Sequence, residues 1–461
     1  MNAELIVRGG TVVTSTGSRV ADVAVAGGRI LAVEDRLPQS AEAYEMDAGG
    51  LLVLPGVVDV HTHTRVPSDS EPDRFFQDSV AAAHGGTTTF LSFNNPGTGS
   101  EQTASLPSDI RAWRGQTEAD SVIDYGLSLV LQPTHVDLRR EIPIAIGAGV
   151  PTFKAFMVYD FALSEAQLEE ALQATAEQPG LLNIHCEDRA ELESNTAQLL
   201  GEGHSQPRYH AQSRPPYVES HGTRKAIDMA RAAGAPMYAV HMSCAAALAE
   251  LRSARKAGEP VFAETCPHFL ALDESRYATP DDECARYVIS PPLRSPVDRE
   301  ALWSALADGT LSQVATDHVP DRLGVEKRLF GQPFPEISNG APGIETLLAV
   351  VYSEGVARGR LSIERMVDVL SSTPARLFGL GSKGSIEPGR DADIVLFDPT
   401  ERRTIKAAEL HHTSDYTPYE GMEAAGYVRS VLVRGEFVIR DGHFVGRRGF
   451  GKFQERQLTW R

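Results

Sequence analysis

The chain has 461 residues, of which 42% are hydrophobic, and its formal net charge at pH 7 is -18. A chain of this length and composition can bury a large core in more than one structural unit, which excludes a disordered or fibrous protein. The acidic charge argues against a nucleic-acid partner, because nucleic-acid binders present a basic face to the phosphate backbone.

The cysteines and the apolar segments indicate in which cellular compartment the protein is expected. Four cysteines are scattered along the chain and show no Cys-x-x-Cys spacing: Cys186, Cys244, Cys266 and Cys284. This favours free thiols in a reducing compartment. Residues 1–8 have no basic start or apolar core of a signal peptide, and no run of about 18 apolar residues occurs. We therefore expect a cytoplasmic protein with no membrane partner.

The first 55 residues predict short strands. Strand candidates are separated by the turn signals Gly9-Gly10 and Gly27-Gly28, and they cover residues 4–8, 11–14, 22–26 and 29–33. Helical periodicity is absent there. Residues 1–55 are therefore expected to belong to a β-rich unit.

From residue 56 onwards, short apolar segments alternate with longer amphipathic ones. The eight strand candidates are Val57 to His63, Thr87 to Phe93, Tyr125 to Leu131, Thr152 to Val158, Leu181 to Cys186, Met237 to His241, Pro260 to Glu264 and Leu311 to Asp317. Helix candidates between them include residues 164–177, 220–233 and 245–256. This alternation predicts an α/β fold, a (β/α)8 TIM barrel over residues 56–380.

Strand patterns return after residue 380. The candidates are residues 393–397, 428–434 and 436–439, with turn signals at Pro388-Gly389 and Asp441-Gly442. We expect residues 381–445 to complete, with residues 1–55, a small β-sandwich domain built from both chain ends. Residues 446–461 read as a polar C-terminal tail that can cover a neighbouring subunit.

The chemistry starts from His61 and His63, which end an apolar strand. Alternation along a strand puts both imidazoles on one face, where they form half of a divalent-metal site, and zinc is the ion that such ligands favour. A histidine pair is also compatible with exposed or core polar positions. The remaining candidates follow or interrupt short apolar segments: Lys154, His185, His241 and Asp317. In a (β/α)8 barrel the C-terminal strand ends carry the active site, so the set indicates a metallohydrolase.

An ordered set of motifs resembles the amidohydrolase superfamily, and more closely its cyclic amidases of the dihydropyrimidinase or D-hydantoinase type. The resemblance covers nearly the whole chain. The motifs are Val58 to His63, Gly85 to Thr89, Phe153 to Met157, Ser213 to Pro216, Glu264 to Pro267, Ser290 to Arg294, Thr316 to His318, Asn339-Gly340 and Asp391 to Val395.

The resemblance implies a binuclear metal site. By it, one zinc ion is held by His61, His63 and Asp317, a second by His185 and His241, and Lys154 bridges them after N6-carboxylation by carbon dioxide. Manganese or cobalt could occupy the same ligands. Burial and nearby cations lower the pKa of a lysine enough to supply the neutral amine that forms a carbamate. Taken alone, Lys154 also reads as an ion-paired lysine at a strand end.

The same resemblance assigns catalytic and substrate-binding roles. The two metals would share a hydroxide nucleophile, and Asp317 would pass its proton to the leaving nitrogen. Tyr159 would stabilise the oxyanion, although an amphipathic tyrosine at the barrel rim is the alternative. Ser290 and Asn339 would grip the cyclic amide through main-chain groups.

Arg65 and Asn95 depart from the hydantoinase pattern. Dihydroorotases place an arginine and an asparagine at these positions to bind a substrate carboxylate, so both are candidate contacts to an anionic or polar ring substituent. The alternative is that Arg65 forms an ion pair with Asp69, Glu71 or Asp73 in its own acidic loop.

The expected function is a metal-dependent hydrolase that opens a cyclic amide or imide of the hydantoin or dihydropyrimidine type. An allantoinase or dihydroorotase activity is the first alternative, favoured by Arg65 and Asn95 and opposed by Tyr159. A metal-free dihydropyrimidinase-related assembly protein is the second, and the intact ligand set opposes it. Relatives are commonly tetramers, so we expect a homotetramer. Three further histidines are interpreted as structural: His84, His268 and His318.

Overall fold

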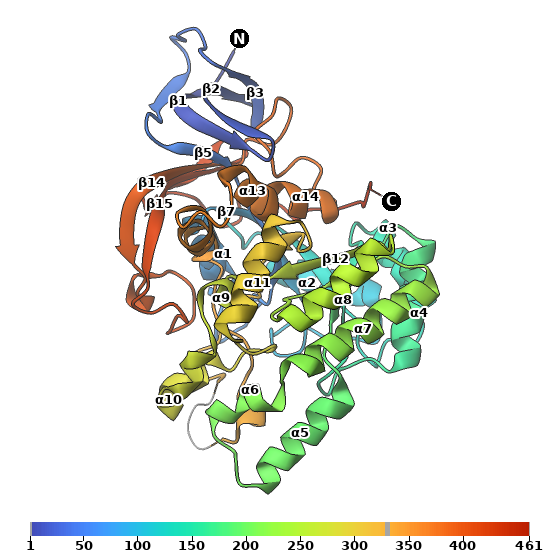
Figure 1. The fold of residues 1–461 in the computed structure, drawn as a ribbon. Coiled ribbons are helices and arrows are strands. Elements are labelled where there is room, and N and C mark those ends of the chain that lie inside the picture. The colour runs from blue at the N-terminus through green and yellow to red at the C-terminus, as the bar shows by residue number, and fades with distance from the viewer. Residues whose placement is uncertain (1, 328–331, 461) are drawn as a thin grey trace.

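A barrel of parallel strands surrounded by helices forms the larger part of the molecule, in a computed structural model that describes residues 2–327 and 332–460 (Figure 1). Within those residues the barrel strands, each hydrogen-bonded to the next, are β6 (Val57–Thr62), β7 (Thr87–Phe93), β8 (Asp124–Val130), β9 (Thr152–Phe156), β10 (Leu181–His185), β11 (Met237–Ala239), β12 (Val261–Thr265) and β13 (Gln313–Val314). The ring closes where Thr62 pairs in parallel with His318. The predicted (β/α)8 barrel is confirmed, and each predicted strand is present.

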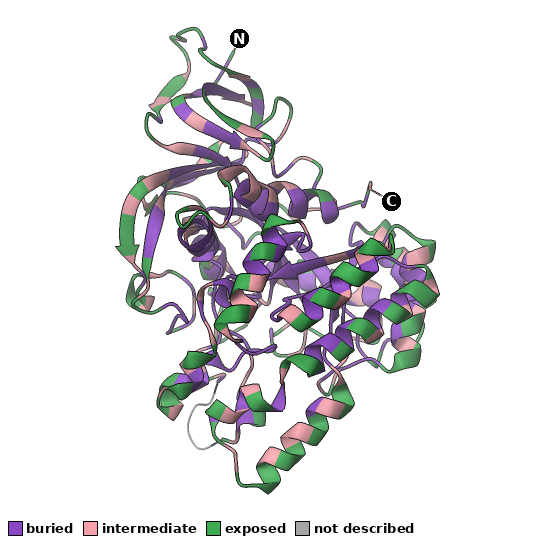
Figure 2. Ribbon diagram, in the orientation of Figure 1, coloured by how far each residue is buried: buried purple, intermediate pink, exposed green. Residues whose placement is uncertain are grey.

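Helices surround the strands and turn their buried faces towards them (Figure 2). The α-helices are α1 (Arg74–His84), α2 (Leu106–Thr117), α3 (Leu138–Gly147), α4 (Glu165–Glu177), α5 (Arg189–Gly201), α6 (His210–Ser213), α7 (Pro216–Ala233), α8 (Ala245–Lys256), α9 (Pro267–Ala271), α10 (Asp281–Cys284), α11 (Pro296–Ala307), α12 (Leu347–Val351), α13 (Ile363–Val367) and α14 (Thr373–Leu377). Helix α7 begins four residues before the predicted start, because a proline is tolerated in the first turn. No helix in the described part of the chain is both long and apolar enough to cross a membrane.

Two of the barrel strands that end earlier than predicted stop two or three residues before a candidate metal ligand. Strand β11 stops at Ala239 and β13 at Val314, whereas the apolar pattern continues to His241 and Asp317. Both residues have a left-handed backbone, with φ of 42° for His241 and 51° for Asp317. Such a conformation cannot continue a β-ladder, so each strand gives way to a turn that carries the functional side chain.

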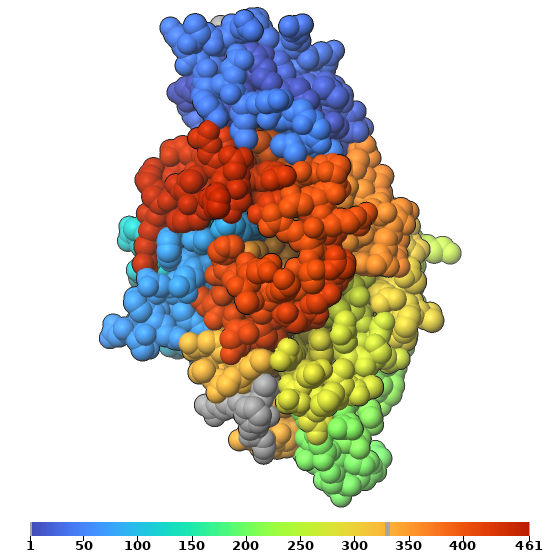
Figure 3. Space-filling model, turned by 90° about the vertical axis from the view of Figure 1, so that its left-hand side faces the viewer, coloured from blue at the N-terminus to red at the C-terminus, as the bar shows by residue number. Residues whose placement is uncertain are grey.

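Both chain ends combine in a second sheet, separate from the barrel, as predicted. In the described residues its strands are β1 (Leu5–Thr14), β2 (Gly17–Ala26), β3 (Arg29–Glu34), β4 (Tyr44–Asp47), β5 (Leu52–Pro55), β14 (Ile394–Thr404), β15 (Glu423–Val433), β16 (Glu436–Arg440) and β17 (His443–Phe444). The hydrogen-bonded order is β17-β16-β15-β14-β5-β1-β2-β3, with β4 beside β1. The antiparallel pair β5 and β14 joins the N-terminal strands to the C-terminal ones, and Figure 3 shows the blue N-terminal region beside the red C-terminal region.

The prediction of a turn at Gly9-Gly10 is wrong. Strand β1 runs through both glycines, and its pairing with β2 shifts register between Val7 and Gly10. Gly9 has φ of +65°, and a Cβ on Gly10 would lie 2.4 Å from the side chain of Val53. The glycines therefore accommodate a β-bulge and a close contact inside one strand.

A buried cluster of charges joins the second sheet to the barrel. The Nζ atom of Lys383 lies 2.5 Å from Asp124, 3.0 Å from Asp391 and 2.8 Å from Asp393. Arg434, which follows β15, also donates to Asp124. Asp124 opens barrel strand β8, so the cluster connects both parts of the molecule.

The C-terminal segment, residues 446–461, differs from the expected polar tail, because its described part lies against this chain's own barrel. The Arg456 side chain is buried and donates to Thr152 Oγ1 at 2.9 Å, and Trp460 Nε1 donates to the Leu377 carbonyl at 2.9 Å. These buried contacts could not be predicted from the sequence, because the segment carries many charged residues.

Candidate active site

A cavity of about 240 Å3 opens at the C-terminal ends of the barrel strands. Every site residue predicted from the sequence lines it: His61, His63, Arg65, Asn95, Lys154, Tyr159, His185, His241, Ser290, Asp317 and Asn339. These residues are spread over almost 280 positions of the chain, from His61 to Asn339. The parallel strand order brings them together, since all the strands point the same way.

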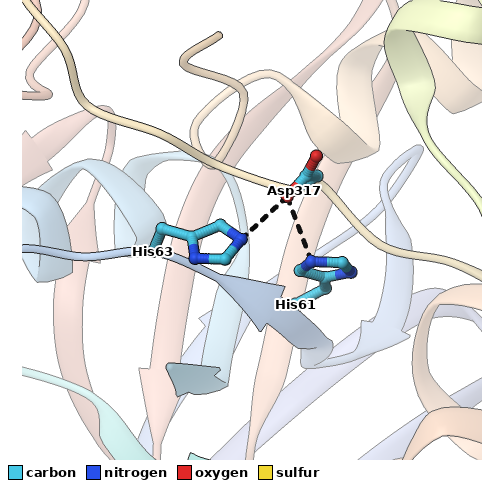
Figure 4. Close-up of side chains that lie close together, drawn as sticks. All are labelled: His61, His63 and Asp317. Atoms are coloured by element: carbon cyan, nitrogen blue, oxygen red, sulfur yellow. Dashed lines mark hydrogen bonds and ion pairs between the residues drawn. The ribbon is translucent and has the colours of Figure 1, made fainter. Parts of the chain in front are cut away.

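His61, His63 and Asp317 form the tightest group in the cavity (Figure 4). The Nε2 atoms of both histidines lie 3.0 Å from the same oxygen, Oδ1 of Asp317. The three potential ligand atoms lie within 4.8 Å of one another. Burial would raise the pKa of Asp317, but the two imidazoles hold it well below its usual range. The carboxylate is therefore ionised at neutral pH.

Lys154, His185 and His241 lie beside this group. Lys154 Nζ lies 3.3 Å from His61 Nε2, and the rings of His185 and His241 have centroids 4.6 Å apart. The ring of His241 also approaches His61, at 5.5 Å between centroids. Burial lowers the pKa of His185 and, more strongly, that of His241, so both rings are neutral and free to act as ligands.

The donor set fits a metal centre. His241 Nδ1 is buried and has no hydrogen-bond partner among the described residues. Lys154 is fully buried, its Nζ has no carboxylate within ion-pair distance in the described chain, and burial lowers its pKa to about 8. A buried ring nitrogen without a partner, such as His241 Nδ1, is costly, and neutral imidazoles beside an ionised carboxylate are the ligands that divalent transition metals prefer.

Two carboxylates that the sequence reasoning missed support the histidines. Glu264 contacts Nδ1 of His61 and accepts from the Tyr238 hydroxyl at 2.7 Å. Glu187 Oε2 lies 2.6 Å from His185 Nε2. Such partners fix the orientation and tautomer of ligand rings. Glu264 opens the motif Glu264 to Pro267, and Glu187 stands two residues after the ligand candidate His185, so these positions were the available signal.

Tyr159, Ser290 and Asn339 lie together on the wall of the cavity. Ser290 Oγ donates to Asn339 Oδ1 at 2.8 Å, and the ring of Tyr159 lies 5.4 Å from that of His185. Tyr159 has φ of 76°, a left-handed conformation that costs about 1–3 kcal/mol in a residue other than glycine. With His241 and Asp317, three site residues hold this rare geometry, which is typical of functional sites.

Arg65 lines the cavity mouth, but its guanidinium already has partners. Nη2 lies 2.5 Å from Asp321 Oδ1, Nη1 donates to the Gly97 carbonyl, and Glu326 lies 3.9 Å from Nε. The alternative of an ion pair is the one found, although the acids come from another loop than Asp69, Glu71 and Asp73. Position along the chain cannot reveal a pair separated by 256 residues.

Asn95 faces a metal-ligand candidate. Its Oδ1 lies 2.6 Å from Nδ1 of His63, and its Nδ2 donates to the Pro96 carbonyl at 3.1 Å. The amide oxygen is therefore occupied by the histidine in this structure.

Comparisons with known proteins agree with this geometry. The profile of the Amidohydrolase family matches residues 52–438. The chain is 39% identical to D-hydantoinase of Geobacillus stearothermophilus over 98% of its own length and 96% of the relative's. It is 38% identical to D-hydantoinase of Streptomyces coelicolor, over 99% and 98% of the two chains. The solved structure of dihydropyrimidinase from Brevibacillus agri matches with a TM-score of 0.93 and 39% identity, over 99% of both chains.

The match thus extends beyond the barrel into the second sheet and covers nearly all of each relative. The resemblance found in the motifs is confirmed, and this chain belongs to the amidohydrolase family, within its group of hydantoinases and dihydropyrimidinases.

Proposed function

We propose that this protein is a metal-dependent hydrolase that opens the amide bond of a cyclic amide or imide of the hydantoin or dihydropyrimidine type. The observation that carries this proposal is one cavity lined by four histidines, a lysine and an aspartate from five barrel strands. The full-length similarity to proteins named D-hydantoinase supports the substrate class.

The ligand roles follow from the grouping in the cavity. His61, His63 and Asp317 would hold one metal ion, and His185 and His241 a second, with Lys154 between them. Zinc suits these donors, and manganese or cobalt is compatible with them. When bound, the ions lower the pKa of a water molecule and polarise the amide carbonyl of the substrate.

Lys154 is proposed to carry an N6-carboxyl group. Its amine is buried between the rings of Phe93 and Phe156, at 5.0 and 5.1 Å from their centroids. Burial lowers its pKa to about 8, so a substantial fraction is neutral near physiological pH. A neutral amine attacks carbon dioxide and loses a proton to form a carbamate. The lysine side chain then carries a negative charge between the histidines.

The other residues handle the substrate and its protons. Asp317 is ionised and accepts a proton from the attacking water, then returns it to the nitrogen of the broken amide bond. The Tyr159 hydroxyl donates a hydrogen bond to the oxyanion, since burial raises its pKa and keeps it protonated. Ser290 and Asn339 hold the ring through main-chain groups. Arg65 and Asn95 remain candidate contacts to a polar ring substituent.

A direct test combines metal analysis with a panel of four rings. Protein purified without chelator is analysed for metal per chain and assayed for ring opening of hydantoin, dihydrouracil, allantoin and dihydroorotate. We expect nearly two metal ions and turnover of hydantoin or dihydrouracil, and Asp317→Asn should abolish the turnover. Turnover of allantoin or dihydroorotate alone would favour the alternative enzymes. Absence of metal and of turnover, even after addition of zinc and bicarbonate, would favour an assembly protein.

The proposal extends to organisation and location. We place the domain limits at 1–55 and 381–445 for the small β domain, 56–380 for the barrel, and 446–461 for the C-terminal segment. A homotetramer is proposed from the family resemblance and is tested by sedimentation. The four cysteines are free and buried in the described residues, which supports the proposed cytoplasmic location.

A further inference from the structure

A second group of metal-ligating side chains lies on the outside of the barrel. His84 is the last residue of α1, Glu345 precedes α12, and His411 lies between β14 and β15. Their potential ligand atoms lie within 4.8 Å of one another. None of the three lines the active-site cavity.

The backbone is built to bring two of these residues together. Gly85 follows His84, and a Cβ at this position would lie 2.6 Å from the Glu345 carbonyl oxygen. Only glycine allows the end of α1 to approach the Glu345 backbone so closely. The contact places the His84 imidazole next to the Glu345 side chain.

The third residue is tied to the same carboxylate. His411 donates from its main-chain N–H to Glu345 Oε2 at 2.6 Å, and its Nδ1 lies 2.8 Å from Oε1. Its ring stacks on that of His84, with centroids 3.6 Å apart and planes at 2°. Two imidazoles in face-to-face contact cannot both be imidazolium cations without strong repulsion, so at least one is neutral.

His84 is the neutral member of the pair. Its Nε2 is buried and lacks a hydrogen-bond partner among the described residues. Burial, with smaller contributions from His411 and His443, lowers its pKa to about 3. A neutral ring nitrogen without a partner, next to a carboxylate whose side chain is only 8% exposed, is available to coordinate a metal ion.

We propose that His84, Glu345 and His411 bind a divalent transition-metal ion, such as Zn²⁺ or Ni²⁺, at a site separate from the active site. Two imidazoles and one carboxylate are donors suited to these ions, and water completes the coordination. His411 is 44% exposed, so its ring can turn out of the stack and direct a nitrogen to the ion. The ion would connect α1, the start of α12 and the segment between β14 and β15.

Nickel binding to the protein as purified tests this site. Protein prepared without a histidine tag is used, and its resident metals are measured before and after equilibrium dialysis against Ni²⁺. We expect one nickel ion per chain in addition to an unchanged resident content. The same nickel should raise the melting temperature, because an ion that binds only the folded state stabilises it.

Three variants separate this site from other histidines. His84→Gln and His411→Gln should each weaken nickel binding by more than roughly ten-fold, since loss of even a supporting partner weakens metal sites by that factor. His221→Gln is the matched control. His221 forms a similar surface pair with Glu191 at 2.8 Å, but no second imidazole in the described residues stacks on its ring. It should bind nickel as the unchanged protein does.

The outcomes are decisive in both directions. Binding lost in both site variants but kept in the control, with unchanged circular dichroism before nickel is added, supports the site. The proposal fails if no additional nickel binds, if nickel uptake equals the loss of resident metal, or if both site variants bind as tightly as the control.

Discussion

Nδ1 of His63 lies 2.6 Å from Oδ1 of Asn95, while Nε2 of the same ring lies 3.0 Å from Asp317. An amide oxygen only accepts hydrogen bonds, so it requires the proton on Nδ1 and leaves the Nε2 lone pair facing Asp317. Asn95 thus sets the tautomer that a metal ligand needs.

We expect Asn95→Ala to weaken metal binding by roughly 10–100-fold, as loss of such a partner does elsewhere. Asn95→Asp keeps an acceptor and should restore most of the affinity. Competition with a chromogenic chelator measures both variants. If Asn95 instead binds a substrate carboxylate, Asn95→Ala would leave metal affinity unchanged and raise KM only for carboxylated rings.

Removing the hydroxyl of Tyr159 should slow the chemical step. Tyr159→Phe is expected to lower kcat by roughly 10²–10³, the usual effect of losing one oxyanion donor. Metal content should not change. Phe161→Leu is the control, because Phe161 stacks on Tyr159 with ring centroids 5.5 Å apart but has no donor. A tyrosine that serves only as part of the rim would change KM and spare kcat.

Carboxylation of Lys154 should depend on pH in the metal-free protein. Only the neutral amine reacts with carbon dioxide, and burial sets the pKa near 8. At constant dissolved carbon dioxide, the rate of ¹³C incorporation seen by NMR should therefore rise about ten-fold per pH unit from pH 6 to 7 and level off above 8. Lys154→Gln should incorporate no label. A rate independent of pH would contradict the assignment.

Much of the barrel could be predicted because its signals are local. Each strand is a short apolar run, and each ligand candidate follows or interrupts one. Alternation within β6 is enough to place His61 and His63 on one face. The strands' common direction then brings their ends to one cavity without knowledge of any distant contact.

The remaining features depend on contacts that leave no local pattern. Glu264 meets His61 across 203 positions, and Asp321 meets Arg65 across 256. The sequence predicted a turn at Gly9-Gly10 because glycine is typical of both turns and β-bulges. Arg456 is buried by its contacts with the barrel, whereas its sequence neighbourhood is polar.

The buried cluster around Lys383 should control the stability of the whole molecule. Lys383→Met removes the one cation that the three carboxylates share and leaves Asp393 without a charged partner, while Arg434 stays on Asp124 and Arg29 on Asp391. Removing one partner of a buried ion pair costs about 3–5 kcal/mol. Thermal and urea unfolding should both show the loss. Lys406→Met, which removes an exposed ion pair with Glu409, is the control. Its melting temperature should equal that of the unchanged protein. Equal stability of the two variants would show that the cluster contributes nothing.

Arg65 decides whether the cavity selects charged rings. Its charge is already compensated by Asp321, which is fully buried, and by Glu326. Further attraction for a substrate carboxylate is therefore small, since the net charge at this wall of the cavity is not positive. We expect Arg65→Ala to raise KM by similar factors for carboxylated and uncharged rings, through loss of the contact to Gly97 in the cavity wall.

Asp321→Asn makes the test sharper, because it frees the guanidinium without removing it. We expect this variant to gain affinity for carboxylated rings such as dihydroorotate relative to dihydrouracil, whereas Arg65→Ala gains none. Initial rates over a range of both substrates give the two KM ratios. If Arg65→Ala alone raises KM far more for the carboxylated ring, Arg65 binds the substrate carboxylate despite Asp321, and the natural substrate carries a negative charge.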